Sequence, residues 1–134
     1  MPKSTIVSRF RVFVACTCAA LACSCGGSSS SSTTPSDPGT STVTITASGV
    51  SPKSITVSAG AQVTFVDNDP SHDHHNIQSD PHPEHTDCPP INDVGFIVSG
   101  QSRQTSNLIV KRVCGYHDHD FPQDSKFFGT ITIQ

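Results

Sequence analysis

Short runs of alternating apolar and polar residues, separated by turn-forming residues, cover the chain after residue 40. Residues 43–45 (V-T-I) and 55–57 (I-T-V) alternate in this way, with Ser-Pro at 51–52 between them. Residues 62–66 (Q-V-T-F-V) alternate again. Further apolar or β-branched runs lie at residues 94–98, 108–116 and 128–133. This period of two, with no convincing helical period, is typical of β-strands.

About seven strands fit into residues 41–134, separated by Gly, Pro, Ser and Asn. That number of short strands favours a sandwich or a small barrel. We therefore expect one all-β domain over residues 41–134.

The first 25 residues have the order of segments of a secretory signal peptide. Lys3, Arg9 and Arg11 form a positive segment ahead of an uncharged, mostly apolar stretch at residues 12–22. This stretch is shorter than the roughly twenty residues that span a bilayer as a helix. We therefore expect residues 1–25 to direct export rather than to remain as a membrane helix.

The sequence L-A-C-S-C-G-G at residues 21–27 resembles a bacterial lipobox, in which a cysteine after a small residue is lipidated and becomes the new N-terminus. Cys23 and Cys25 both fit, and an ordinary signal peptide cut nearby is the alternative. Residues 26–40 are Gly, Ser, Thr and Pro with one acid, which is typical of a flexible linker. We expect a lipid-anchored protein of the cell envelope, periplasmic or surface-facing.

Loss of the signal segment makes the chain more acidic. Five basic residues remain against all eleven acidic ones, so the net charge changes from −3 to −6 with neutral histidines. This charge argues against nucleic acid as a partner and favours a basic patch on any protein partner.

All seven histidines fall in two segments that break the strand pattern, residues 67–92 and 117–127. They are His72, His74, His75, His82, His85, His117 and His119. Imidazole is the commonest side-chain ligand of transition metals and suits copper, zinc, iron and nickel. A single loop histidine such as His72 or His74 is usually only solvated, but seven in two segments predict a metal site.

Residues 54–69, followed by His75-Asn-Ile at 75–77, resemble the first half of a cupredoxin, whose pattern is V-x-x-G-x-x-V-x-F-x-N-x-D and then a histidine ligand. Cysteine and histidine ahead of G-T-I-T-I at 129–133 resemble its second half. The resemblance implies a Greek-key β-sandwich with one copper ion at one end, and His75 matches the first histidine ligand. The function implied is one-electron transfer or copper handling.

The rest of the site departs from the cupredoxin pattern. A blue-copper centre uses two histidines, a cysteine thiolate and usually an axial methionine. The only methionine is Met1, so Gln123 or a backbone oxygen would have to replace it, and Phe127 stands at its position. Cys114 has the right spacing to His117, but Asp118 fits the thiolate position better.

Two assignments of the cysteines remain. D-P-H-P-E-H-T-D-C-P at residues 80–89 and C-G-Y-H-D-H at 114–119 resemble two stretches that occur together in a subgroup of exported cupredoxin-like proteins. Two cysteines that occur as a pair suit a disulfide between Cys88 and Cys114. Copper would then be held by His75, His117 and His119, with His82 or His85 as a further ligand. Alternatively Cys114 is a copper ligand. Zinc accepts the same histidines, but copper ranks higher in affinity.

Other classes of protein compete with this interpretation. G-Y-H-D-H at residues 115–119 also resembles a signature of copper/zinc superoxide dismutases, but no histidine follows His119. A fragment of a multicopper oxidase would need more H-x-H pairs, and a non-metal adhesion domain would leave the histidines solvated. We expect a copper-binding protein or electron carrier rather than an enzyme, with no catalytic residue and with a redox or copper-donor protein as partner.

Overall fold

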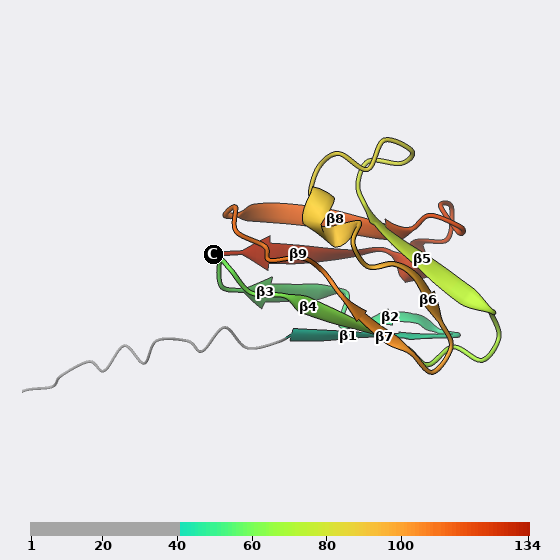
Figure 1. The fold of residues 1–134 in the computed structure, drawn as a ribbon. Helices are drawn as coiled ribbons and strands as arrows, with labels where there is room; N and C mark the ends of the chain where they lie inside the picture. Colours follow the sequence, from blue (N-terminus) through green and yellow to red (C-terminus); the bar gives the residue numbers. More distant parts are fainter. Residues whose placement is uncertain (1–40) are drawn as a thin grey trace, which may run out of the picture. The chain divides into compact units, whose positions relative to one another are not determined.

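The fold was obtained as a computed structural model, which describes residues 41–134 (Figure 1). The expected signal segment, the lipidation at Cys23 or Cys25 and the linker at 26–40 lie outside these residues. The strands are β1 Ser41–Thr46, β2 Gly49–Ser51, β3 Ser54–Val57, β4 Val63–Asp67, β5 His74–Ser79, β6 Gly95–Val98, β7 Ser102–Gln104, β8 Arg112–Asp118 and β9 Gly129–Ile133. Two short 3₁₀ helices lie between strands, η1 Pro89–Ile91 after β5 and η2 Ser125–Phe127 after β8. None of the helices in this range is long and apolar enough to cross a membrane.

The strands form two sheets that face each other (Figure 1). One sheet has the order β2-β1-β4-β7, and the other has the order β3-β9-β8-β5-β6. The pairs β1–β4 and β3–β9 are parallel, while the remaining pairs are antiparallel. The expected all-β sandwich is therefore confirmed.

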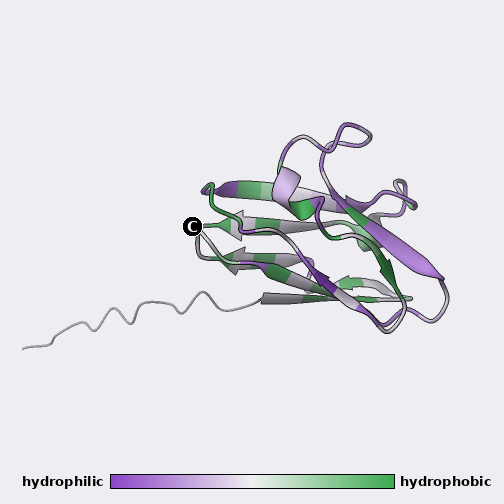
Figure 2. Ribbon diagram, in the orientation of Figure 1, coloured by the Kyte–Doolittle hydropathy of each residue, from purple (hydrophilic) through white to green (hydrophobic). Residues whose placement is uncertain are grey.

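Alternation along the strands builds the core between the sheets. Val43 and Ile45 of β1, and Val63 and Phe65 of β4, are fully buried, while the residues between them are partly exposed. The same alternation appears in Figure 2 as apolar segments within strands whose connecting loops are mostly polar. Burial of these side chains supplies the main driving force for folding, at about 1.5–3 kcal/mol for each large one.

Two strand boundaries differ from the sequence-based expectation. Residues 67–92 were expected to be irregular, yet β5 lies inside them and carries His74 and His75. The strand expected over residues 108–116 is shifted along the chain, since β8 starts at Arg112 and includes His117. In both places histidines occupy strand positions, and their polarity hid the alternation that tertiary packing imposes.

Side chains of β8 alternate between the two faces of the five-stranded sheet. Cys114, Tyr116 and Asp118 are buried and share one face, which points into the sandwich. His117 therefore points to the outer face, because successive side chains of a strand alternate. The loop after β5 folds back over this outer face, where a backbone hydrogen bond of 3.1 Å joins Asp80 N to Gly115 O.

The sulfur atoms of Cys88 and Cys114 are joined in the structure, with a Cα–Cα distance of 5.9 Å. Both residues are buried, Cys114 completely. The bond attaches the end of the loop after β5 to the middle of β8. It therefore fixes the loop that carries His82 and His85 against the strand that carries His117.

Candidate metal centre

The described residues contain two groups of side chains that could hold a metal ion. One group is His82, His85, His117 and His119, and the other is Asp69, His72 and His75. In each group one ligand atom per residue lies within 4.8 Å of those of the others. We call them the four-histidine cluster and the Asp69 cluster.

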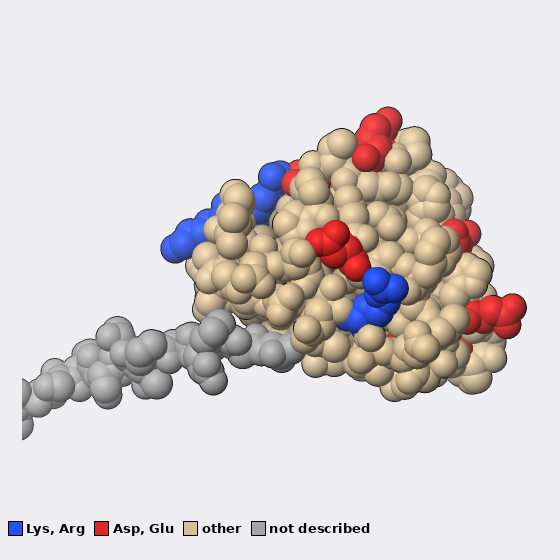
Figure 3. All heavy atoms as spheres, in the orientation of Figure 1, with Lys and Arg blue, Asp and Glu red and all other residues tan. Residues whose placement is uncertain are grey.

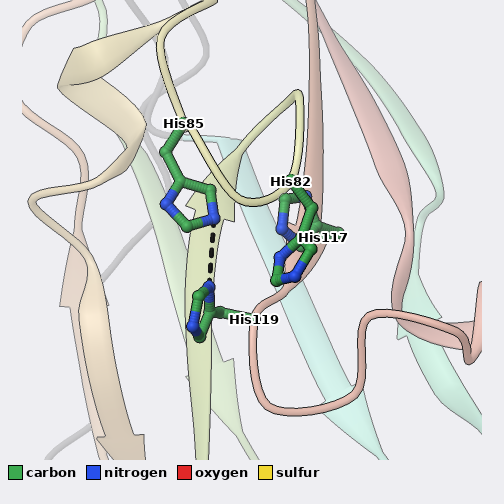
Figure 4. A group of neighbouring side chains, drawn as sticks. All are labelled: His82, His85, His117 and His119. Atoms are coloured by element: carbon green, nitrogen blue, oxygen red, sulfur yellow. Dashed lines mark hydrogen bonds between the residues drawn. The ribbon is translucent and has the colours of Figure 1, made fainter.

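The four-histidine cluster lies between β8 and the loop that follows β5. His117 comes from β8 and His119 from just after it, while His82 and His85 reach across from the loop (Figure 4). His119 Nδ1 and His85 Nε2 are 3.1 Å apart, and the His82 ring lies 4.9 Å from the His119 ring between centroids. Two nitrogens at this separation suit neighbouring ligands of one ion, since metal–imidazole bonds are about 2.0–2.1 Å long.

His117 is held by a carboxylate on one side and is unpartnered on the other. Its Nδ1 lies 2.7 Å from Asp80 Oδ1, while its buried Nε2 has no hydrogen-bond partner. A metal-ligating histidine usually donates its second ring nitrogen to a carboxylate in this manner, which fixes the tautomer and leaves the other nitrogen for the metal. A buried polar atom without a partner is costly, and a metal ion at the four-histidine cluster would remove that cost.

The loop that brings the histidines together is closely fitted to β8. A Cβ atom at Gly115 would lie 1.9 Å from Asp80 Oδ2, so only glycine lets the Asp80 carboxylate sit there. His85 adopts a left-handed backbone conformation with φ of 54°, which is uncommon outside glycine. Asn92 Nδ2 donates to His85 O at 2.8 Å and stabilises this geometry. Such strain is found where surrounding structure enforces a functional position.

The charge state of the four-histidine cluster also suits a metal. Burial lowers the pKa of His85, and the neighbouring His119, His117 and His82 lower it further. A neutral imidazole has the lone pair that binds a metal, whereas the protonated ring has none. Four imidazole donors without a thiolate match a nitrogen-ligated Cu(II) site.

The Asp69 cluster lies on the inner side of β8. His75 shares the inward face of β5 with the core residue Ile77, and its Nδ1 lies 2.5 Å from Asp118 Oδ2. Asp69 Oδ2 lies 3.3 Å from His75 Nε2 and 2.7 Å from His72 Nδ1. Burial opposes protonation of His75, but Asp118, Asp67 and Asp69 together raise its pKa.

The structure groups the expected ligands differently from the sequence-based interpretation, which placed His75 with His117 and His119. Here His117 and His119 lie on the outer face of β8 with His82 and His85, while His75 lies on the inner face against Asp118. The physical reason is strand alternation at residues 117–119, which sends Asp118 inward between two outward histidines.

The structure also places Cys114, His72 and His74, which the sequence-based interpretation treated as a possible ligand or as solvated histidines. Cys114 is bonded to Cys88 and belongs to neither cluster. His72 was expected to be solvated but belongs to the Asp69 cluster, whereas His74 is exposed and lies 3.1 Å from Asp120. Asp69 and Asp80 were not singled out, although Asp80 stands directly before the P-H-P-E-H stretch.

Comparison with known proteins identifies the fold only. No protein-family model matches the sequence, and no curated protein matches it. Solved structures do match: a purple cupredoxin from Nitrosopumilus maritimus has a TM-score of 0.53 and 19% identity over 70% of this chain and 99% of its own. The oxidised plastocyanin of Dryopteris crassirhizoma has a TM-score of 0.53 and 19% identity over 70% of this chain and all of its own.

A reduced Cu(I) form of an amicyanin variant has a TM-score of 0.53 and 15% identity over 72% of this chain and 83% of its own. These similarities, together with the two sheets, make the domain a Greek-key β-sandwich of the cupredoxin-like fold.

Proposed function

We propose that this protein is a copper-binding protein of the cell envelope, which holds Cu(II) on the four-histidine cluster and takes part in copper handling. The observation that carries the proposal is the geometry of His117, whose Nδ1 is held by Asp80 while its buried Nε2 has no partner. Bound copper would supply one-electron redox chemistry. His82, His85, His117 and His119 would bind the ion, and Asp80 would orient His117.

Exposure of the four-histidine cluster supports capture and release of copper. His82 is exposed, His85 and His119 are partly exposed, and only His117 is buried. One rigid ligand on a strand, combined with ligands on a surface loop, gives copper a route in and out from solvent. A donor or acceptor protein would therefore approach the loop at residues 80–88.

One-electron transfer is the second candidate function, and the cupredoxin-like fold supports it. The plastocyanin and amicyanin structures that match this fold are described in oxidised and reduced forms. Copper handling predicts fast exchange of copper with a competing chelator. Electron transfer instead predicts slow exchange and a reversible voltammetric wave.

The experiment that tests the proposal is Cu(II) binding by the purified protein and two single variants, measured by competition with a chelator. His117→Ala removes the best-oriented ligand and should abolish tight Cu(II) binding at the four-histidine cluster, which lowers the number of tightly bound ions by one. His74→Ala removes an exposed histidine that belongs to neither cluster, so it should bind like the unaltered protein. Equal affinity in both variants would contradict the proposal.

We further propose that the lipidated N-terminus anchors the protein and that residues 26–40 hold the domain off the membrane. The negative net charge that remains without residues 1–25 favours a basic protein partner, and the face drawn in Figure 3 has scattered acidic groups as well as a strip of basic ones at its upper left edge. Mass spectrometry of the exported protein should find a lipid on Cys23 or Cys25. An unmodified N-terminus would contradict the anchor.

A further inference from the structure

We propose that Asp69, His72 and His75 form a second metal site, which takes a divalent cation of borderline character such as Zn²⁺. This site is separate from the four-histidine cluster in its ligands and in its place in the fold.

One carboxylate oxygen faces both imidazoles of the site. Asp69 Oδ2 lies 2.7 Å from His72 Nδ1 and 3.3 Å from His75 Nε2. Ligand atoms on one tetrahedral ion lie about 3.3 Å apart, given bonds of about 2.0–2.1 Å. The His75 distance matches this value, while His72 is hydrogen-bonded to Asp69 and would move away from it slightly to bind an ion. Two nitrogens and one carboxylate oxygen are a donor set that zinc accepts, with a fourth position left for water.

A second carboxylate orients His75 from behind. Asp118 Oδ2 lies 2.5 Å from His75 Nδ1, while Asp118 Oδ1 accepts hydrogen bonds from the backbone N–H of Asn76 at 3.1 Å and of Asp120 at 3.0 Å. This arrangement points His75 Nε2 toward Asp69. It repeats, on the inner side of β8, the relation that Asp80 has to His117 on the outer side.

Buried negative charge around His75 independently supports a bound cation at this site. Asp67, Asp69 and Asp118 are all fully buried, and no lysine or arginine in the part of the chain that the structure describes pairs with them. Asp67 Oδ2 also has no hydrogen-bond partner. Buried charges are normally paired or bound to a metal. A dication bound by neutral His72 and His75 would offset two of these three charges without requiring either histidine to be protonated.

The surroundings of the site exclude water except at one side. Phe127 packs on His75 with 4.7 Å between ring centroids, and Phe121 packs on His72 at 4.6 Å. The His72 side chain remains 27% exposed and provides the route for a cation to enter. The ligand set differs from the one implied by the cupredoxin resemblance, which contained neither Asp69 nor His72.

The test is the number of Zn²⁺ ions bound by the metal-free protein, measured by titration calorimetry and by metal analysis after gel filtration. We expect two ions in the unaltered protein and one in His72→Gln, because His72 is a ligand that can be replaced at the surface. Asp69→Asn should give the same loss, and His72→Gln keeps the test valid if Asp69→Asn does not fold. The matched control is His74→Gln, which should still bind two.

Two results would overturn the second site: a single ion in the unaltered protein that His72→Gln does not displace, or two ions in both His72→Gln and Asp69→Asn. Failure of the four-histidine cluster has a different signature. In that case His117→Gln would bind as many ions as the unaltered protein, while His72→Gln would still lose one.

Discussion

His117 Nδ1 lies 2.7 Å from Asp80 Oδ1, while Nε2 of the same ring is buried without a partner. Asp80 belongs to the loop after β5 and His117 to β8, so the contact joins the two elements that supply the four-histidine cluster. It orients the ring before any metal arrives.

Asp80→Asn should lower Cu(II) affinity by about 10–100-fold, the usual loss when a carboxylate partner of a ligating histidine is removed. The matched control is Glu84→Gln, which removes a negative charge from the same loop at an exposed position. Competition with a chelator measures both. Equal losses in the two variants would show that charge, and not orientation of His117, is responsible.

Gly115→Ala should displace the loop from β8, because the new Cβ atom would lie 1.9 Å from Asp80 Oδ2. We expect a loss of about 1–3 kcal/mol in the free energy of unfolding, as for other overpacked sites, together with weaker copper binding. Val113→Ala is the control, since Val113 lies on the same face of β8 but is exposed. A Gly115→Ala protein with unaltered stability and affinity would refute the close fit of loop and strand.

The double variant Cys88→Ser/Cys114→Ser should lower the free energy of unfolding by about 2–4 kcal/mol, because the bond closes a loop between residues 26 apart. Urea denaturation measures the loss, and a thiol titration of the unfolded, unreduced protein should find no free thiol at these two positions. Two reactive thiols would instead favour Cys114 as a free ligand.

The metal-free protein should lose a stabilising contribution from His75 as the pH rises. Its pKa is raised in the folded state from an ordinary value of 6.5, so the protonated ring stabilises the fold fully below that value. The contribution disappears as the pH passes the folded-state pKa. The difference in unfolding free energy between the unaltered protein and His75→Gln, measured with chelator present, should therefore shrink from mildly acidic to alkaline pH. A constant or growing difference would contradict the buried pairing with Asp118 and Asp69.

The sheets were predictable from the sequence because their strands alternate. In β1 and β4 the buried positions are apolar and every second residue, as at Val43 and Ile45 or at Val63 and Phe65. Strand β5 was missed because its first three residues are His74, His75 and Asn76, whose placement depends on hydrogen bonds to neighbouring strands. No local pattern in the sequence contains that information.

The sequence predicted that histidines would form a metal site, but not which histidines would share it. Seven histidines in two segments indicated a metal, and the positions of Asp118 and Phe127 argued against a blue-copper centre. The partners of His117 were not predictable, because the loop at residues 80–88 must fold back before His82 and His85 reach β8. The position of His75 on the other face depends on its inward place in β5, which the sequence pattern did not reveal.

The most direct test of a histidine-ligated copper site is the EPR and visible spectrum of the purified protein loaded with one equivalent of Cu(II). Binding by the four-histidine cluster predicts nitrogen superhyperfine structure in the EPR spectrum and a weak visible absorption, and both signals should change in His117→Ala but not in His74→Ala. An intense thiolate-to-copper band, together with a free thiol in the metal-free protein, would place Cys114 on the metal and contradict the proposed site.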